Sequence, residues 1–289
     1  MFGRVITAMA TPFTKTGEID WIQLEKLIEH LIKTGSDSLV VSGTTAESPT
    51  LTHSEKLELF RFAVKTAAGR VKIIAGTGSN NTQQSIELSR QAAACDVDAL
   101  MLVAPYYNKP SQEAMIQHFQ AIAERTELPI VLYNVPGRTS SNLLPATVAQ
   151  LAEHQNIVAV KEASGDIDQI SLLARLLPDD VVIYSGDDSL TLPILSIGGV
   201  GVISVASHLF GLELQEMIQS YEQGNVKRAL ELHQQLYPAF KGLFLTSSPA
   251  PLKYAMSELG LCEPTLRLPL IELNQQEKEA VKEWLYSLR

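Results

Sequence analysis

Lys161 is the residue whose type and place point most directly to chemistry. It follows the apolar run 157–160 (Ile-Val-Ala-Val), a pattern typical of a strand buried on both faces. At the mouth of such an apolar interior, loss of water disfavours the ammonium form and lowers the pKa of the lysine. A neutral amine can attack a ketone and form an imine. The alternative is a structural ion pair between Lys161 and Glu162 or Asp166, and the lysine alone does not separate the two interpretations.

A phenol and a guanidinium stand at the end of another apolar run, 129–133. Tyr133 closes that run and can relay protons where its phenol meets other hydroxyls, although a tyrosine in such a place is more often a core residue. Arg138 follows a predicted Pro-Gly turn, where its guanidinium suits a carboxylate. An arginine on an exposed loop is usually only solvated, so Arg138 indicates a binding site only together with the residues around it.

Hydroxyl groups follow two more runs. Thr44 and Thr45 come after a glycine, where adjacent backbone N–H groups can form a nest for a carboxylate; a plain turn into the next helix is the alternative. Tyr106 and Tyr107 follow the run 99–103 and add two phenols. If the runs are parallel strands of one barrel, all these side chains meet at one rim.

Other chemistries lack the residues or the spacing that they need. Asp187 and Asp188 form an acidic pair, but they serve equally well as caps of the helix expected after them, so we expect no metal. Neither Cys95 nor Cys262 belongs to a CxxC pair or a Cys/His cluster. The glycine-rich segment 76–81 departs from the GxGxxG pattern of nucleotide sites. The amine, phenols, hydroxyls and arginine therefore point to imine chemistry on a small keto acid.

The elements that must position these residues alternate regularly. Eight short apolar runs recur along the 289 residues, and amphipathic segments of helical period lie between them, for example 21–33 and 54–68. The second of these opens with Thr52 and Glu55, a capping-box pattern. Eight such units predict an α/β fold, the (β/α)8 barrel, rather than a doubly wound sheet. The runs are 5–8, 38–41, 72–75, 99–103, 129–133, 157–160, 181–184 and 201–204.

Chain length and charge limit the remaining classes of protein to which the chain could belong. We expect the barrel to span 1–224 and a C-terminal helical domain to occupy 225–289. A formal net charge of −9 argues against a nucleic-acid partner, which needs clustered Lys and Arg. The N-terminus is typical of a first strand rather than a signal peptide, and the nearly apolar run 192–206 is too short for a membrane span. With only two cysteines, a cytoplasmic location is expected.

Five motifs together resemble the dihydrodipicolinate synthase family, and their spacing matches along the whole chain. The lysine motif alone marks a broader superfamily of pyruvate-dependent aldolases, whereas the 133–139 segment with the double tyrosine is more specific. One departure is Ala46, where the family usually has glycine; if this position needs φ > 0, alanine is a mild strain. The motifs are 43–48 (GTTAES), 106–110 (YYNKP), 133–139 (YNVPGRT), 160–162 (VKE) and 185–188 (SGDD).

The resemblance implies a lyase of lysine and diaminopimelate biosynthesis. In the reaction that the resemblance implies, pyruvate would condense with Lys161 to an imine, the derived enamine would attack the aldehyde of L-aspartate-4-semialdehyde, and transimination would close the ring. Tyr133 would move protons, and Thr44 would link it to Tyr107 of the neighbouring subunit. No metal, PLP or nucleotide cofactor is expected, because the protonated imine is the electron sink. The implied substrate-binding residues are Thr45 for the pyruvate carboxylate, Arg138 for the semialdehyde carboxylate, and Gly186 with the carbonyl of Ile203 as lining.

The resemblance also implies self-association and a regulatory pocket. Tyr107 in trans requires at least a dimer, and the family is commonly a dimer of dimers. In members inhibited by lysine, a histidine stands at the position of Lys56 and a glutamate at that of Gln84, so we predict weak or absent inhibition here. The alternative is that Lys56 simply projects from its helix into solvent. The implied pocket comprises Ser48, Pro49, His53, Lys56, Asn80, Gln84 and Tyr106.

Two rival functions stay open. One is another pyruvate-dependent aldolase, such as an N-acetylneuraminate lyase or a 2-keto-3-deoxy-sugar-acid aldolase; a polyol chain needs no cation at Arg138, whereas a semialdehyde carboxylate does. The other is a non-catalytic barrel that binds a keto acid and acts as a regulator. The joint presence of Lys161, Tyr133 and Thr44 argues against that regulator.

Overall fold

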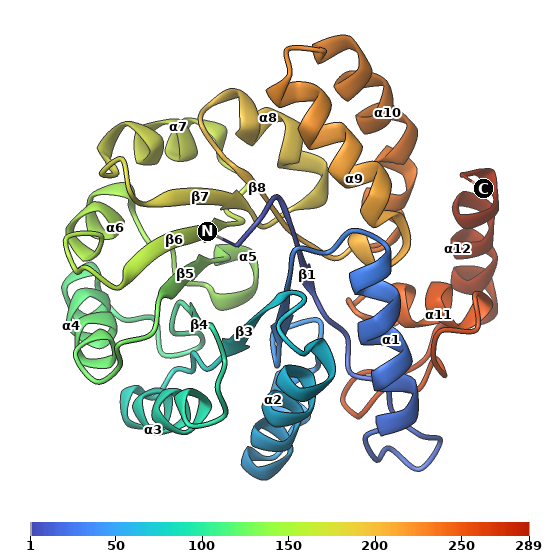
Figure 1. The fold of residues 1–289 in the computed structure, drawn as a ribbon, viewed down its shortest axis with the longest axis horizontal. Helices are drawn as coiled ribbons and strands as arrows, with labels where there is room; N and C mark the ends of the chain where they lie inside the picture. Colours follow the sequence, from blue (N-terminus) through green and yellow to red (C-terminus); the bar gives the residue numbers. More distant parts are fainter. Residues whose placement is uncertain (1, 289) are drawn as a thin grey trace.

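Eight parallel strands, paired in chain order and closed by the pairing of β1 with β8, form a barrel in the computed structural model, which describes residues 2–288 (Figure 1). The predicted (β/α)8 fold is therefore confirmed. Four predicted runs match strands residue for residue, and the others differ by one or two residues at one or both ends. The strands are β1 Val5–Ala8, β2 Ser38–Val41, β3 Lys72–Gly76, β4 Ala99–Val103, β5 Ile130–Asn134, β6 Ile157–Glu162, β7 Val182–Ser185 and β8 Gly201–Ser204.

The strands are apolar along their length because both of their faces are buried. On β5, Ile130 and Leu132 belong to the large cluster that packs against the helices, while Val131 and Tyr133 belong to a second, smaller cluster. That second cluster takes residues from all eight strands, so it fills the inside of the barrel. Inward side chains near the carboxyl ends of the strands form the floor of any site at that rim.

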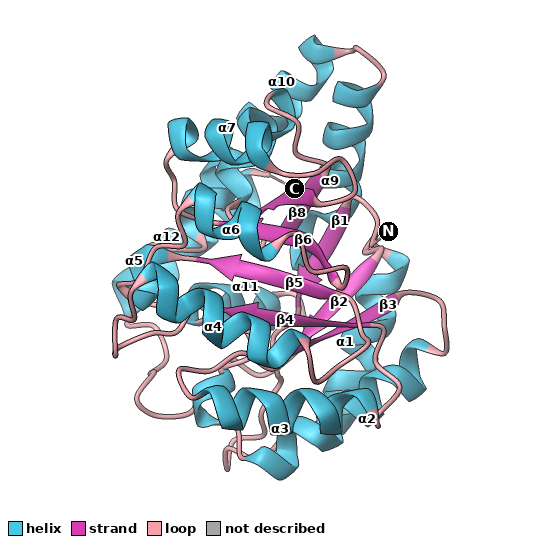
Figure 2. Cartoon of the chain, turned by 90° about the vertical axis from the view of Figure 1, so that its left-hand side faces the viewer, coloured by secondary structure: helices cyan, strands magenta, loops and turns pink. Residues whose placement is uncertain are grey.

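Helices surround the barrel, as the side view shows (Figure 2). The predicted helix 21–33 is α1, which buries its leucines against the strands, and the predicted helix 54–68 lies one residue earlier as α2. Thr52 and Glu55 form the predicted capping box of α2. Helices between the strands are α1 Trp21–Lys33, α2 His53–Ala67, α3 Thr82–Ala93, α4 Gln112–Ala123, α5 Pro136–Thr139, α6 Pro145–Leu151, α7 Ile167–Leu176 and α8 Thr191–Ser196.

Four further helices follow β8, namely α9 Ser207–Glu222, α10 Val226–Gly242, α11 Ala250–Glu258 and α12 Gln275–Ser287. Helix α10 packs along α9, and α12 packs against both α10 and α11. In Figure 1 the last two helices lie on the side of α1. The division of the chain into domains at residue 224 stays a prediction.

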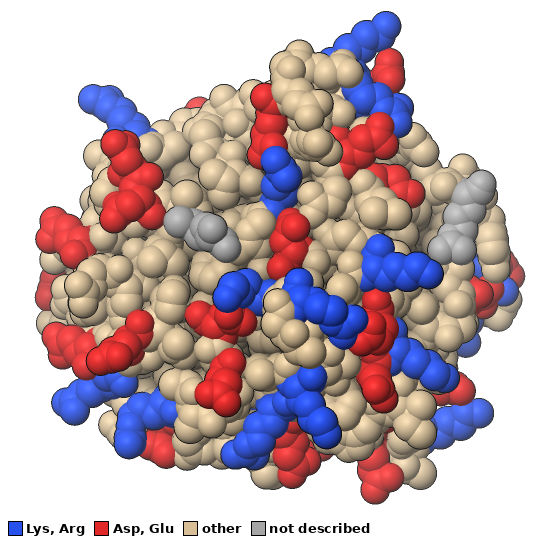
Figure 3. Space-filling view, viewed as in Figure 1, with Lys and Arg blue, Asp and Glu red and all other residues tan. Residues whose placement is uncertain are grey.

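The surface carries charges of both signs. On the face seen in Figure 3, Lys and Arg side chains are interspersed with Asp and Glu side chains and form no continuous basic area. Within residues 2–288, no helix is long and apolar enough to cross a membrane.

Candidate active site

Lys161 lies within β6, since the strand continues to Glu162 instead of ending with the apolar run at Val160. Side chains alternate along a strand, so Lys161 points to the same side as Ala159, a member of the inner cluster. Only 5% of Lys161 is exposed. The amine is thus held inside the barrel at its carboxyl end, where active sites of this fold lie.

The surroundings of Lys161 change its pKa. Burial lowers the pKa of the amine to about 8; the negative charge of Asp188 opposes this shift, and the positive charge of Arg138 adds to it. The alternative of an ion pair with Glu162 or Asp166 is wrong. The Glu162 carboxylate accepts hydrogen bonds from neighbouring amide groups, and that of Asp166 caps α7.

Tyr133 lies beside the amine on the adjoining strand. It pairs with Lys161 in the register of β5 and β6, and the Lys161 Nζ is 4.2 Å from the centroid of its ring. Burial raises the pKa of the phenol, while the charge of Arg138 and the nearby Thr44 side chain lower it. Thr44 and Tyr133 line the same cavity, but no direct hydrogen bond joins their hydroxyls among residues 2–288, so the hydroxyl chain stays a prediction.

Arg138 belongs to α5, a single helical turn where the sequence predicted a Pro-Gly turn. This helix lies beyond the carboxyl end of β5, toward which the strand arrow points in Figure 2. The turn is fixed by Thr139, whose hydroxyl donates to the Ser141 carbonyl at 2.8 Å and has the Val135 carbonyl at 3.1 Å as an alternative acceptor. Within residues 2–288, the guanidinium has no ion-pair partner, so it is free to bind an anion.

Thr44 and Thr45 occupy a tight turn after β2. The N–H groups of Ala46, Glu47 and Ser48 donate back into this turn, to the carbonyls of Gly43 and Thr44. Within the described part of the chain, the backbone N–H of Thr45 has no acceptor although the residue is only 4% exposed. A buried N–H without a partner is rare in folded proteins. Thr45 does not itself line the cavity of the site, so the binding of a carboxylate by this N–H stays a prediction.

Ala46 does not carry the strain considered for it. The residues of this turn with positive φ are Ser42 at 62° and Glu47 at 58°. Ala46 is instead buried in an ordinary conformation, and its carbonyl accepts from the Thr11 hydroxyl. Alanine therefore fits this position without the conformational freedom of glycine.

Gly186 lies against the Lys161 side chain, and Ile203 lies inside the same barrel. A Cβ on Gly186 would come within 2.7 Å of the Ala163 Cβ and 3.1 Å of the Lys161 Cγ, so no side chain fits there. The N–H of Gly186 donates to the carbonyl of Glu162 at 2.7 Å. Ile203 belongs to the inner cluster on β8 and is fully buried.

The two acidic residues after β7 have different roles, whereas the sequence predicted both as possible helix caps. Asp187 caps a short 3-10 turn, accepting from the Ser189 N–H at 2.8 Å. Asp188 is buried and binds the turn after β8: it accepts from the Ser204 hydroxyl and from the backbone N–H of Val205 and Ala206. No local sequence pattern predicts this role of Asp188. Residues 2–288 contain no cluster of three His, Cys, Asp or Glu side chains suited to a metal ion.

The two neighbouring tyrosines go to different places. Tyr106 lines the cavity of the site. Tyr107 is 87% exposed, has a φ of 72°, and does not line that cavity. Its phenol is therefore not brought to Tyr133 within one chain.

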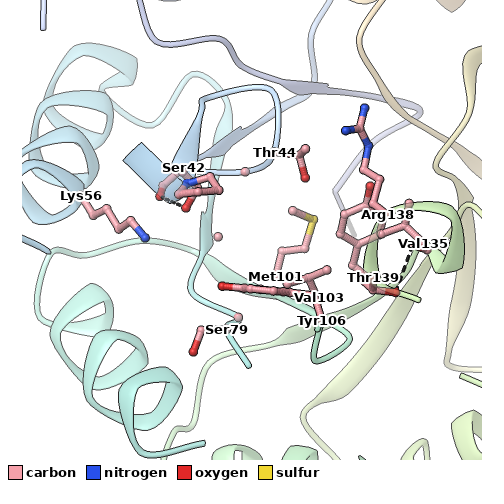
Figure 4. Close-up of a pocket in the computed structure, with 16 residues that line it drawn as sticks. Ser42, Thr44, Lys56, Ser79, Met101, Val103, Tyr106, Val135, Arg138 and Thr139 are labelled. Carbon is pink, nitrogen blue, oxygen red and sulfur yellow. Dashed lines mark hydrogen bonds between the residues drawn. The ribbon is translucent and has the colours of Figure 1, made fainter. Parts of the chain in front are cut away.

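A cavity of about 290 Å³ connects the two groups of predicted residues. Thr44 and Arg138 lie at one end and Lys56 at the other (Figure 4). Tyr133 also lines this cavity, and Lys161 lies behind its ring. Lys161 itself does not line the cavity, which runs from Tyr133 and Arg138 toward the predicted regulatory residues Ser48, Pro49, Lys56 and Tyr106.

Lys56 does not project into solvent, which the alternative interpretation expected. It is half-buried and lines both this cavity and a second one of about 340 Å³, which also has His53, Gln84 and Glu87 in its wall. Burial lowers the pKa of Lys56, and within residues 2–288 no acidic side chain pairs with it. Asn80 lines neither cavity; its amide donates to the Tyr106 carbonyl at 3.1 Å.

Comparisons with known proteins agree with this geometry. The sequence model of the Dihydrodipicolinate synthetase family matches residues 1–288. A 4-hydroxy-tetrahydrodipicolinate synthase of Desulforudis audaxviator is 56% identical over 281 residues, which cover 97% of this chain and 96% of the relative. The crystal structure of a dihydrodipicolinate synthase from Bacillus anthracis has a TM-score of 0.97 and 49% identity, covering 99% of this chain and 98% of the other. A dihydrodipicolinate synthase of Cyanidioschyzon merolae, solved with lysine bound, has a TM-score of 0.97 and 44% identity over 99% of this chain and 98% of its own.

Proposed function

The chain belongs to the Dihydrodipicolinate synthetase family, and we propose that it condenses pyruvate with L-aspartate-4-semialdehyde, as a 4-hydroxy-tetrahydrodipicolinate synthase does. The observation that carries this proposal is the amine of Lys161, which is almost wholly buried at the barrel rim and has its pKa lowered to about 8. A buried amine with a lowered pKa is partly neutral near pH 7 and can attack a ketone.

The first half of the reaction forms an enamine. The Lys161 nitrogen adds to the keto carbon of pyruvate, and loss of water leaves a protonated imine. Removal of a methyl proton then gives the enamine, with the imine nitrogen accepting the electron pair. Tyr133 moves these protons in this scheme; its ring lies beside the Lys161 amine, and Thr44 lines the same cavity as its phenol. No metal, PLP or nucleotide cofactor enters this scheme.

The second half joins the two substrates. The enamine carbon attacks the aldehyde of the semialdehyde, and the amine of that substrate displaces the Lys161 nitrogen as the ring closes. Thr45 offers its unpaired N–H to the pyruvate carboxylate, and the guanidinium of Arg138 binds the carboxylate of the second substrate. Gly186 leaves room for the Lys161 side chain, and the carbonyl of Ile203 lines the site.

The complete site requires a second subunit in this proposal. Tyr107 would reach the Thr44 hydroxyl of a neighbouring chain, which makes the active form at least a dimer and, as is common in the family, a dimer of dimers. We place this enzyme in the cytoplasm, with lysine and diaminopimelate biosynthesis.

Trapping with borohydride tests the proposed function. Pyruvate and borohydride should leave a reduced adduct on Lys161, which mass spectrometry locates, and Lys161→Ala should abolish it. Lys109→Ala is the matched control, because Lys109 lies exposed on the loop after β4 and should leave the adduct intact. An adduct that survives in the Lys161 variant contradicts the assignment.

The choice of aldehyde separates the rival functions. A sugar-acid aldolase would form the same adduct but consume a polyol aldehyde instead of aspartate-4-semialdehyde. A regulator that only binds a keto acid would give no adduct at all.

A further inference from the structure

A buried ion pair joins the C-terminal helices to the turn that carries Thr44 and Thr45. The Lys253 Nζ, from α11, lies 2.5 Å from the Glu47 Oε1, and both side chains are fully buried. The other oxygen of Glu47 accepts from the backbone N–H of Arg267 at 2.9 Å. Glu47 is therefore held at both carboxylate oxygens by one C-terminal segment.

Stability alone does not explain such a pair, because the free energy lost when two charges leave water is about as large as the free energy gained from their attraction. Here Glu47 stands two residues after Thr45 and has a left-handed backbone, with φ of 58°. Its N–H donates to the Thr44 carbonyl at 3.0 Å. The contacts that fix the Glu47 side chain therefore also fix the turn that contains the unpaired Thr45 N–H.

The same C-terminal segment also contacts other parts of the chain near this turn. The guanidinium of Arg267 pairs with Glu55 on α2 and donates to the Thr50 carbonyl at 2.9 Å. Phe13, in the loop after β1, has the Lys253 Nζ at 4.1 Å and the Arg267 guanidinium at 4.4 Å from its ring centroid. Such contacts of cations with an aromatic face hold both side chains in place.

We infer that Glu47, Lys253 and Arg267 are positioning residues, through which the C-terminal helices fix the carboxylate-binding turn Thr44–Thr45. They touch no substrate. They hold the Thr45 N–H where a keto-acid carboxylate reaches it, so the segment after the barrel is part of the binding machinery. This inference rests on the proposed role of the turn in binding pyruvate.

A double variant separates positioning from folding. Glu47→Leu with Lys253→Met replaces the ion pair by apolar groups of similar size, an exchange that is often neutral for stability. We expect its thermal midpoint to fall somewhat, because the Arg267 N–H and the Thr265 carbonyl lose their partners, while the protein stays folded. The KM for pyruvate should rise by about tenfold, the loss expected when one hydrogen bond to a charged group is weakened. At saturating pyruvate the borohydride adduct on Lys161 should still form. A stable double variant with an unchanged KM overturns the inference.

Two further variants keep the test decisive if the double variant does not fold. Arg267→Met leaves the buried pair intact but removes the hydrogen bond to the Thr50 carbonyl and the ion pair with Glu55. It should raise the KM for pyruvate severalfold and speed amide hydrogen exchange in peptides covering 43–51. If neither changes, the inference fails. Lys72→Met is the matched control: it breaks an exposed ion pair with Asp98 at the opposite end of the barrel and should change neither. If the parent itself forms no pyruvate adduct, the proposed function fails instead.

Discussion

At the scale of single residues, the environment of Lys161 sets the pH range in which its amine can react. Burial lowers the pKa from 10.5 to about 8, so the neutral amine is the minor form below that pH and the major form above it. The rate of imine formation at low pyruvate should therefore rise with pH up to about 8 and then level off. Borohydride trapping over a pH series measures this rate, and a rise that continues to the ordinary pKa of 10.5 contradicts the expected burial.

Arg138 should act on the second substrate far more than on the first. Arg138→Ala removes a charge-assisted contact worth ~1.5–3 kcal/mol, so the KM for the semialdehyde should rise on the order of tenfold to a hundredfold. Imine formation with pyruvate should change little, and the pKa of Lys161 should rise slightly because a nearby positive charge is lost.

Steady-state kinetics with each substrate varied in turn check this difference. Arg138→Lys keeps the charge but loses the planar fork, and it should fall between the parent and the alanine variant. Equal damage to both half-reactions would assign Arg138 a structural role.

Residues of the site differ in how far sequence alone could predict them. Lys161, Tyr133 and Arg138 could be found because each lies at or just after an apolar run, and the carboxyl ends of parallel strands meet at one rim. Asp188 and Lys253 could not, because their partners lie 16 and 206 residues away along the chain. No local pattern encodes such contacts.

At the scale of elements, strand identity could be predicted better than strand ends. Apolar runs marked the strands because both faces are buried. Strand β6 extends past its apolar run because Glu162 pairs with Asn134 on β5 and with Ser185 on β7. The pairing of neighbouring strands, rather than hydrophobicity, therefore decides where β6 ends and places Lys161 inside the strand.

The cavity between α2 and α3 leads to a prediction on lysine. A bound lysine would bring cationic groups next to Lys56, which has no acidic partner within residues 2–288, and would meet only an amide at Gln84. Glu87 lines the same cavity, but its carboxylate already accepts from the Gln91 amide and lies 3.4 Å from an Arg90 nitrogen. We therefore expect weak or no inhibition by lysine.

Calorimetric titration with lysine, together with an activity assay, checks this expectation. The variant Lys56→His with Gln84→Glu supplies an anion and removes the permanent charge, so it should bind lysine more tightly than the parent. Tight binding and strong inhibition in the parent would show that the remaining polar groups of the pocket suffice.

At the scale of the whole molecule, one chain brings most of the predicted catalytic residues together but leaves Tyr107 apart from them. Thr44, Tyr133 and Arg138 line one cavity, with Lys161 behind the ring of Tyr133. Tyr107 stands almost fully exposed outside that cavity, on a loop whose backbone is fixed by its N–H bond to the Thr139 carbonyl. An exposed phenol on a fixed loop is suited to a site on another subunit. Sequence could not predict this placement from residue types, since Tyr106 and Tyr107 are chemically alike and adjacent.

A complementation experiment tests the shared site. Tyr107→Phe should lower turnover, because the hydroxyl chain to Tyr133 loses a member, and Lys161→Ala should be inactive. Co-refolding the two variants gives mixed dimers in which the intact Lys161 of one subunit meets the intact Tyr107 of the other. Equimolar mixing should restore about a quarter of the parent activity, since half of random dimers are mixed and each holds one complete site. Replacing the Lys161→Ala partner by a Tyr107→Phe/Lys161→Ala double variant removes every complete site, so that mixture should show no such recovery. Mixed dimers that recover nothing, once native mass spectrometry has shown that they formed, would mean that Tyr107 does not act across the subunit boundary.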